Sequence, residues 1–311
     1  MQVIRGLHNI REQHHGCFVS IGNFDGVHRG HEQILRHLVA RARNENAKTL
    51  VMIFEPQPKE FFEPDSAPLR VTGFREKLAR LAACGIDWVL CVPFNQRFRS
   101  LSAQAFVSEV LVGQLAVTHV SIGDDFRFGC DRAGNLAYLQ TAALDHGFAV
   151  TDNGTIEHQD ARISSTRIRQ TLAAGKISEA NALLGWEYQL SGRVVHGMAL
   201  GRTLGVPTAN IRLHAYRPAL QGVVAVTVQG AGDKTVNGVA NIGPKPTVNG
   251  SQATLEVHLL DFDGDLYGQH LFVTPKLKLR DIHKFETLDQ LKQQIFDDIA
   301  QARAYFSKQE R

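Results

Sequence analysis

Cysteine is scarce in this 311-residue sequence, and so are methionine and tryptophan, with four, three and two copies. The four cysteines, Cys17, Cys84, Cys91 and Cys130, form no CxxC pair, and each stands among apolar or small residues. Structural zinc sites and disulfide frameworks need paired cysteines at regular spacing. The pattern indicates neither of them, and we expect reduced, packed thiols.

A strong net charge and a long apolar run are also missing. The 34 Lys and Arg residues nearly balance the 31 Asp and Glu residues, and the basic residues are scattered, which does not indicate a nucleic-acid partner. No apolar stretch approaches the roughly 18 residues that span a bilayer. The start, MQVIRGLHNIREQHH, lacks the apolar core of a signal peptide. We therefore expect a cytoplasmic protein without a membrane partner; its oligomeric state is not predicted.

The composition is that of a folded protein, with 43% hydrophobic and 21% charged residues. A chain of this length exceeds the usual span of about 100 to 200 residues for one domain. We expect two domains, residues 1–185 and 186–311, with the boundary near Gly185. Before it, Thr166 to Leu184 reads as a helical segment interrupted at Gly175.

The first half alternates short apolar runs with amphipathic stretches, the rhythm of βα units. It predicts an open α/β fold with a parallel sheet. The expected strands are 17–21, 49–54, 88–92, 119–122 and 148–150. The expected helices are 31–43, 74–84, 103–112 and 136–147.

After about residue 186 the pattern changes to β-branched runs broken by Gly, Pro and Asn, which predicts an antiparallel β module. A helix is expected at the end of the chain, with Thr287 and Gln290 forming a capping box. Its apolar face is expected only to cover the β module. That face consists of Leu288, Leu291, Ile295, Ile299, Ala302 and Phe306.

The first candidate site is GNFDGVHRGH, residues 22–31, between the first expected strand and helix. Gly22, Gly26 and Gly30 allow close backbone approach, and a helix N-terminus offers N–H groups to an anion. His28 and His31 add side-chain donors. This pattern indicates a phosphate-binding turn; taken alone, it also fits two surface histidines at a helix start.

A second polar turn is RISSTRIR, residues 162–169. It places the hydroxyls of Ser164, Ser165 and Thr166 beside Arg162 at an expected helix start. By itself the run also fits a capped helix with solvated arginines. Together with HxGH it predicts a second anion-binding turn.

These motifs, with FEPQP at 54–58 and GDDFRFG at 123–129, resemble the adenylyltransferase domain of prokaryotic FAD synthetases, within the HxGH nucleotidyltransferases, over residues 16–175. The resemblance implies a Rossmann-like fold in which FMN phosphate attacks the α-phosphate of ATP. It implies that His28, His31 and Arg162 stabilise the charge on the transferred group and pyrophosphate, with Mg²⁺ screening the triphosphate. The nucleotide-binding residues that it implies are Gly22, Asn23, Phe24, Asp25, Phe62, Asp125, Ser164, Ser165 and Thr166.

Three positions qualify this resemblance. Phe62 fits base stacking but also core packing. Gln57 stands where many relatives have His, and Asp125 stands where some have Asn. These departures weaken the roles of single residues and leave the family resemblance in place.

In the β module, GRTLGVPTAN at 201–210 supplies Gly201 and Gly205 for a close phosphate-wrapping loop. Pro207 restricts the backbone, and Thr208 and Asn210 offer the oxygen ligands that Mg²⁺ favours. Gly-rich loops ending in Pro-Thr also occur without function, so the neighbouring motifs decide the interpretation.

Those neighbours are ANIGPKPTV at 240–248, LEVHLLDF at 255–262 and DLYG at 265–268. From Tyr188 to Phe306 the chain resembles riboflavin kinase modules, which implies a six-stranded Greek-key barrel. The resemblance makes Glu256 the general base for the riboflavin 5′-hydroxyl and gives magnesium and nucleotide phosphates to Thr208 and Asn210. Glu256 and His258 are expected on one face. Val224, Lys245 and Ile282 depart from the usual pattern.

The function predicted is therefore bifunctional: riboflavin is phosphorylated to FMN, and FMN is adenylylated to FAD, with ATP as co-substrate of both reactions. One alternative is an HxGH adenylyltransferase for another acceptor, fused to an unrelated β domain. The other is a flavin-binding regulatory protein with an inactive β module. GVPTAN with LEVHLLDF argues against the first, and Thr208, Asn210 and Glu256 argue against the second.

Overall fold

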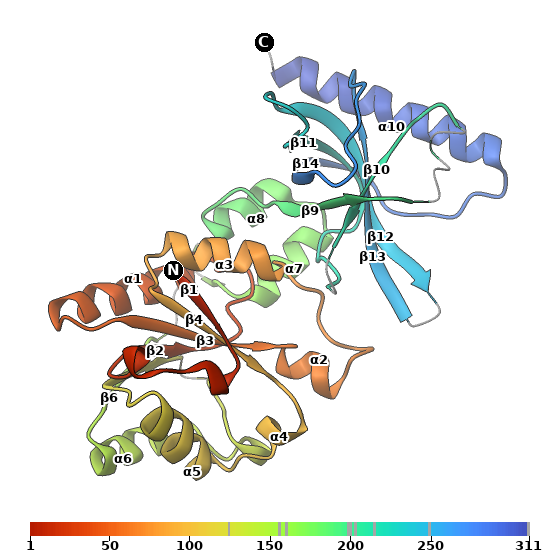
Figure 1. Cartoon of the computed structure of the whole chain (residues 1–311). Coiled ribbons are helices and arrows are strands. Elements are labelled where there is room, and N and C mark those ends of the chain that lie inside the picture. The colour runs from red at the N-terminus through yellow and green to blue at the C-terminus, as the bar shows by residue number, and fades with distance from the viewer. Residues whose placement is uncertain are drawn as a thin grey trace. The chain divides into compact units, whose positions relative to one another are not determined.

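The structure, a computed structural model, describes residues 1–123, 125–154, 157–158, 161–197, 201, 204–213, 216–247 and 250–309. These residues form two compact units (Figure 1). The first unit consists of residues 1–68 and 77–163, and the second consists of residues 69–76 and 164–311. Among the described helices, none is both long and apolar enough to cross a membrane.

A parallel six-stranded sheet forms the centre of the first unit, in the order β1-β4-β3-β2-β5-β6. Its strands are β1(Gln2–Arg5), β2(Phe18–Ile21), β3(Thr49–Glu55), β4(Trp88–Pro93), β5(His119–Ile122) and β6(Ala149–Asp152). The predicted α/β fold is confirmed. The sequence pattern missed β1, whose four residues include a single fully buried side chain, Ile4. A short antiparallel pair, β7(Glu157–His158) and β8(Ala161–Arg162), follows the sheet.

The connecting segments of the first unit are mostly helical. They are η1(Leu7–Asn9), η2(Glu12–His14), α1(Arg29–Asn44), α2(Pro58–Phe62), α3(Phe74–Ala83), α4(Gln96–Arg99), α5(Ala103–Ala105), η3(Phe106–Gln114), η4(Cys130–Arg132) and α6(Leu136–His146). The helix expected over 103–112 is a one-turn α5 that continues into η3, a π-helix. A π-helix keeps an apolar face while changing the residues that point toward the sheet.

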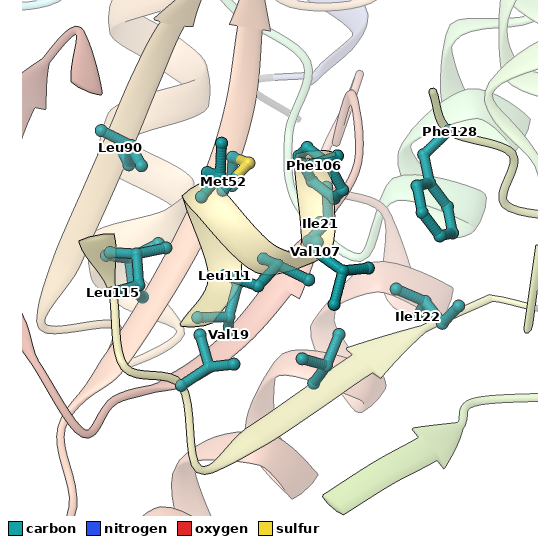
Figure 2. Close-up of a cluster of buried hydrophobic side chains, with 14 of the residues drawn as sticks. Val19, Ile21, Met52, Leu90, Phe106, Val107, Leu111, Leu115, Ile122 and Phe128 are labelled. Carbon is teal, nitrogen blue, oxygen red and sulfur yellow. The ribbon is translucent and has the colours of Figure 1, made fainter. Parts of the chain in front are cut away.

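The core of the first unit lies between the sheet and these helices. Figure 2 shows Leu111 and Leu115, from η3 and its end, close to Val19 of β2. Met52 and Leu90 of the neighbouring strands belong to the same cluster of buried residues. All five side chains are fully buried. Burial on both faces is why these strands read as continuous apolar runs instead of alternating ones.

Thiol burial agrees with the expected reduced, packed cysteines. Cys17 is fully buried at the start of β2, and burial raises the pKa of its thiol to about 12. Cys84, next to α3, is partly buried, and burial raises its pKa to about 11. Both thiols stay protonated at neutral pH, which makes them poor nucleophiles.

The second unit is built on a closed antiparallel barrel with the strand order β10-β13-β12-β11-β14-β9, as the sequence predicts. The strands are β9(Leu190–Val195), β10(Ala209–Arg212), β11(Gly222–Gln229), β12(Val236–Thr247), β13(Gly250–Leu259) and β14(His270–Arg280). The helices are α7(Ser165–Ala173), α8(Ile177–Leu184) and α10(Leu288–Gln309). Closure pairs every strand on both edges, so no strand of the barrel is left as an open edge.

The interrupted helix expected before the barrel is present as α7 and α8, with Gly175 between them at a positive φ of 73°. Both helices belong to the second unit. Lys278 of β14 donates to the Ala173 carbonyl, and Tyr188 N–H donates to the Asn181 side chain. Residues 69–76 also belong to this unit. The compact units therefore do not divide the chain at a single position. The functional domains 1–185 and 186–311 stay a prediction.

Candidate active sites

The strand order of the first unit has a switch point between β2 and β5. From β2 the sheet continues through β3 and β4 on one side and through β5 and β6 on the other. In open α/β sheets ligands bind at the carboxyl ends of the strands at such a point. Gly22 follows β2 and Gly123 follows β5, and the two strands pair in register from Phe18 and His119. The HxGH turn thus lies at the position where this fold binds ligands.

The turn from Gly22 to His28 is conformationally strained. Phe24 and Val27 have positive φ angles of 45° and 37°, which a β-branched or aromatic residue rarely adopts. Gly26 has a φ of 89°, which glycine tolerates. Phe24 and Asp25 are buried, whereas Asn23 is exposed. Strain of this kind persists only where the surrounding structure holds it, and it collects at ligand sites.

The two histidines of the motif stand face to face. Their ring centroids are 3.6 Å apart with 18° between the planes. Nδ1 of His28 accepts a hydrogen bond from the His31 N–H, so His28 caps α1. Because its Nδ1 accepts, a neutral His28 carries its proton on Nε2 as a donor. The helix-start interpretation and the phosphate-site interpretation of His28 therefore hold together.

His31 is neutral at physiological pH. Burial lowers its pKa well below the usual 6.5, and electrostatic interactions with His28 and Lys77 lower it further. Nδ1 of His31 is buried without a hydrogen-bond partner in the described part of the chain. A neutral imidazole can still donate a hydrogen bond to a phosphate oxygen, but it adds no positive charge.

Arg162 and Asp125 lie together in the first unit. Arg162 Nη2 and Asp125 Oδ2 are 3.3 Å apart, and both side chains are largely exposed. An exposed pair of this kind contributes about 0–1 kcal/mol. This pair by itself therefore does little to hold the Arg162 side chain in place.

Phe62 is not a core residue. Its side chain at the end of α2 is 54% exposed, so its alternative interpretation as core packing is wrong. The guanidinium of Arg99 lies over its ring at 5.3 Å, and Phe94 contacts it edge-on. Gln57, at the start of α2, is buried, and its Nε2 has no partner among the described residues.

Ser164, Ser165 and Thr166 lie at the N-terminus of α7, as expected. Ser164 is the N-cap, and its hydroxyl accepts from the Arg167 N–H. These residues belong to the second unit and the two histidines to the first, so each group is described within its own unit.

The second site is a cavity of about 310 Å³ on the outside of the barrel. It brings together Gly201, Thr208 and Glu256 of the predicted residues, along with His258. His258 shares the face of Glu256 on β13, as predicted, while Leu255, Val257 and Leu259 are buried on the opposite face. Nδ1 of His258 is 2.8 Å from the Pro207 carbonyl oxygen, a contact that links the strand to the loop.

Three polar residues lie side by side across neighbouring strands at this site. Glu256 pairs with Asn210 of β10 and with Asn241 of β12. Residues opposite one another in an antiparallel sheet point to the same face. Asn241 lines the cavity and was not among the predicted residues; its only sequence signal is its place in ANIGPKPTV. Asn210 is opposite Glu256 but is not among the residues that line the cavity.

The loop before β10 depends on its glycines. A Cβ on Gly201 would lie 2.4 Å from the Val206 carbonyl oxygen, which is closer than these two atoms can approach. Only glycine therefore fits there. Gly205 has a φ of 80°. Pro207 and Thr208 follow at the cavity edge. This tight loop matches the expectation from the sequence, although Gly205 and Pro207 do not line the cavity themselves.

The terminal helix does more than cover the barrel, which corrects the expectation for its apolar face. Leu291, Ile295 and Ile299 line the cavity, whereas Ala302 and Phe306 pack on the barrel. Leu288, at the start of the helix, is 62% exposed. The expected N-terminal cap is present, since the Thr287 hydroxyl accepts from the Gln290 N–H.

Two of the three departures in this module are placed by the structure. Ile282 lines the cavity, next to the polar groups. Val224 is fully buried on β11 and does not line it. The side chain of Lys245 lies outside the part of the chain that the structure describes. Only Ile282 can therefore be linked to cavity contacts here.

Comparison with known proteins gives a consistent picture. A family model described as FAD synthetase matches residues 10–167, and one described as riboflavin kinase matches residues 184–306. The chain is 50% identical over 307 residues to a "Bifunctional riboflavin kinase/FMN adenylyltransferase" of Escherichia coli strain K12, covering 98% of both chains. A protein of the same name from Pseudomonas fluorescens is 50% identical over 309 residues, covering 98% of this chain and 97% of its own.

A solved structure also resembles the whole chain. It is described as a macrolide-efflux protein from Streptococcus pneumoniae, with a TM-score of 0.76 and 31% identity. The match covers 97% of this chain and 98% of that one. The name of that protein differs from those of the sequence relatives, and no activity is transferred from it.

Fold and sites together define a class of two-unit proteins in which an α/β sheet with an HxGH turn precedes a closed barrel with a carboxylate-containing cavity. Both family models and the full-length relatives fit this class. The chain belongs to the family of bifunctional riboflavin kinase/FMN adenylyltransferases.

Proposed function

We propose that this chain phosphorylates riboflavin to FMN and adenylylates FMN to FAD, with ATP as the co-substrate of both reactions. The observation that carries the proposal is that each unit has a polar site of its own: the stacked histidines in the first unit and the barrel cavity in the second. We assign FMN adenylylation to residues 1–185 and riboflavin phosphorylation to residues 186–311. The cytoplasmic location remains a prediction from the sequence.

For phosphorylation, Glu256 accepts the proton of the riboflavin 5′-hydroxyl as the oxygen attacks the γ-phosphate of ATP, whose bond to the β-phosphate oxygen breaks so that ADP leaves. Glu256 lines the cavity together with polar residues such as Asn241 and with aliphatic residues of α10. Such a cavity suits a flavin ring beside a polar reaction centre. A general base in reach of the hydroxyl contributes about 10² to 10⁴ in rate.

The donors around Thr208 fit a magnesium ion bound with nucleotide. Thr208 and Asn210 supply neutral oxygens, and Mg²⁺ commonly takes few protein ligands and completes its shell with phosphates and water. When bound, the ion would neutralise charge on the transferred phosphate. In the described part of the chain there is no cluster of three His, Cys, Asp or Glu residues that could hold a metal by itself.

For adenylylation, an FMN phosphate oxygen attacks the α-phosphate of ATP and pyrophosphate leaves. His28 and His31 donate hydrogen bonds to phosphate oxygens, and Arg162 supplies positive charge. The turn from Gly22 to Asp25 offers further donors within the first unit. The phosphate-binding roles of Ser164, Ser165 and Thr166, which lie in the second unit, stay a prediction from the sequence. Asp125 positions Arg162, and Phe62 stacks on an aromatic ring of the substrate. This reaction needs donors and positioning rather than a protein nucleophile.

A crossed mutant experiment tests both assignments. Purified protein is given riboflavin or FMN, with ATP and Mg²⁺, and the flavins are separated. Unmodified protein is expected to make FMN and FAD. The H28A/H31A double variant is expected to make FMN but no FAD. The E256Q variant is expected to make FAD from supplied FMN, while its rate of FMN formation from riboflavin falls at least about 10²-fold. Chelation of Mg²⁺ should stop both reactions.

Other outcomes would contradict the proposal in separable ways. Equal loss of both activities in the histidine variant would refute separate sites. Unchanged phosphorylation by E256Q would remove Glu256 from the mechanism. Bound but unconverted riboflavin would favour a regulatory flavin-binding protein.

A further inference from the structure

Lys77, on α3, is the only lysine among the fully buried residues of the described chain. Its exposure is 0%, and its Nζ donates a 2.7 Å hydrogen bond to the carbonyl oxygen of Asn23. A buried ammonium group is costly unless it is well hydrogen-bonded. A lysine in this position therefore needs an explanation beyond the filling of space, for which an apolar side chain would serve.

The acceptor of this hydrogen bond belongs to the strained turn of the HxGH site. Asn23 directly precedes Phe24, and Phe24 and Val27 are the two non-glycine residues of the turn with positive φ. Such conformations are unfavourable and need support from their surroundings. The Asn23 side chain is exposed, so its backbone carbonyl is what fixes this end of the turn to α3.

Lys77 also acts on the histidines through its charge. Its ammonium group is among the charges that lower the pKa of His31. His31 is stacked on His28, so the charge of Lys77 acts on a ring that belongs to the histidine pair of the motif. With His31 neutral, Lys77 is a fixed positive charge near the place where phosphate groups are expected.

We propose that Lys77 is a positioning residue for adenylyl transfer, which holds the turn from Gly22 to His28 in its strained conformation and supplies a buried positive charge that favours the phosphates of ATP. The inference rests on the proposed function, because it takes the histidine pair as the adenylyl-transfer site. Lys77 itself touches the turn and not the reacting atoms.

The test replaces Lys77 in the full chain and uses its own kinase activity as the internal control. K77M keeps the length of the side chain and removes the charge. K77Q also removes the charge but keeps a donor that can reach toward the Asn23 carbonyl. For both variants, kcat and KM for ATP are measured in FAD formation from FMN, with active protein counted from the thermal unfolding of the first unit.

We expect KM for ATP in FAD formation to rise at least about tenfold in K77M, with a smaller rise in K77Q, while riboflavin phosphorylation stays within about twofold. K48M is the matched control. Lys48 is 64% exposed and pairs with Asp87 at 3.0 Å, so its removal should change neither activity.

Two outcomes would contradict the proposal for Lys77. If KM for ATP is unchanged in K77M and K77Q, or if the first unit fails to fold in both, Lys77 has only a structural role and the proposal is wrong. H28A is measured in parallel. If H28A keeps full FAD formation, the proposed site itself fails, whatever the Lys77 variants do.

Discussion

At the scale of single residues, His119 shows how burial in the sheet of the first unit changes the pKa of a titratable side chain. It is buried on β5, with its ring stacked on Phe18 at 4.8 Å. Its Nε2 is 3.0 Å from the Thr151 hydroxyl. Burial, with a smaller contribution from the charge of Arg41, lowers its pKa from 6.5 to about 4. The folded state therefore holds His119 neutral over a range in which the unfolded chain would protonate it.

This difference predicts a loss of stability in acid. Because the unfolded state binds the proton more readily, the contribution of His119 is complete above pH 6.5 and is lost as pH falls toward about 4. Urea unfolding between pH 4 and 7 should show this fall, and H119Q should show a shallower one. An identical pH slope in both proteins would mean that His119 does not contribute.

The same scale shows which site residues a sequence reveals. Gly22, His28, Thr208 and Glu256 lie in short motifs whose spacing carries the chemistry. Asn241 and Lys77 carry no such signal, because what matters is the partner that each meets across the fold. Asn241 is opposite Glu256 only through strand pairing. Lys77 reads as one charge among many on an amphipathic helix, and its complete burial depends on packing.

At the scale of elements, α10 is joined to the barrel by a buried ion pair next to the cavity. Arg280 of β14 donates from Nε and Nη2 to the carboxylate of Asp298, at 2.8 to 3.1 Å. Their side chains are 18% and 3% exposed. Nη1 of Arg280 donates to the Asp281 carbonyl, and its guanidinium lies over the ring of Phe285. One arginine thus orders both the helix and the segment that closes the cavity.

Removal of the carboxylate should damage both stability and flavin binding. D298A leaves Arg280 largely buried without its main partner, which costs about 3–5 kcal/mol in such pairs. We expect a lower melting temperature of the second unit and a raised KM for riboflavin. D261A is the control, because the Asp261–Arg303 pair also involves α10 but is largely exposed. A KM for riboflavin equal to that of D261A would show that the Arg280–Asp298 ion pair does not affect flavin binding in the cavity.

Periodicity predicted most elements and only part of their roles. The three- and four-residue spacing of α10 placed its apolar face correctly, yet the cavity-lining part of that face looks the same in sequence as the part packed on the barrel. In the same way, the apolar spacing over 103–112 could not distinguish an α-helix from the π-helix η3, since both bury one face. β1 was missed because an edge strand of four residues has too few buried positions to form a pattern.

At the scale of the whole molecule, the second unit extends beyond the barrel. Ile168 and Leu172 of α7 and Leu183 and Leu184 of α8 are fully buried. Their burial is worth about 1.5–3 kcal/mol for each large aliphatic side chain. A fragment of residues 186–311 lacks α7 and α8. We therefore expect it to keep the kinase activity but to be less stable than a fragment that includes both helices.

We predict that residues 164–311 phosphorylate riboflavin and melt several degrees above residues 186–311. Both fragments retain Thr208, Asn210 and Glu256, so their kcat values at low temperature should agree. Calorimetry and the flavin assay check this directly. Equal melting temperatures would show that α7 and α8 contribute nothing to the barrel.

The sequence pattern could not predict that residues 69–76 belong to the second unit. Arg70 N–H donates to the Arg217 carbonyl, and Ala219 N–H donates to the Arg70 carbonyl, both at 2.8 Å. These are backbone contacts between segments nearly 150 positions apart. Composition and periodicity describe neighbours along the chain, and they contain no information on such a pairing.

That pairing constrains how such enzymes can exchange parts. A recombinant that joins the first half of one relative to the second half of another at residue 164 would carry a foreign piece, residues 69–76, against its own 217–219. The backbone hydrogen bonds at Arg70 could still form in such a recombinant. The side chains packed around them would, however, come from two different proteins. Chimeras that move residues 69–76 together with the barrel should accordingly be recovered in active form more often than those made with a single crossover.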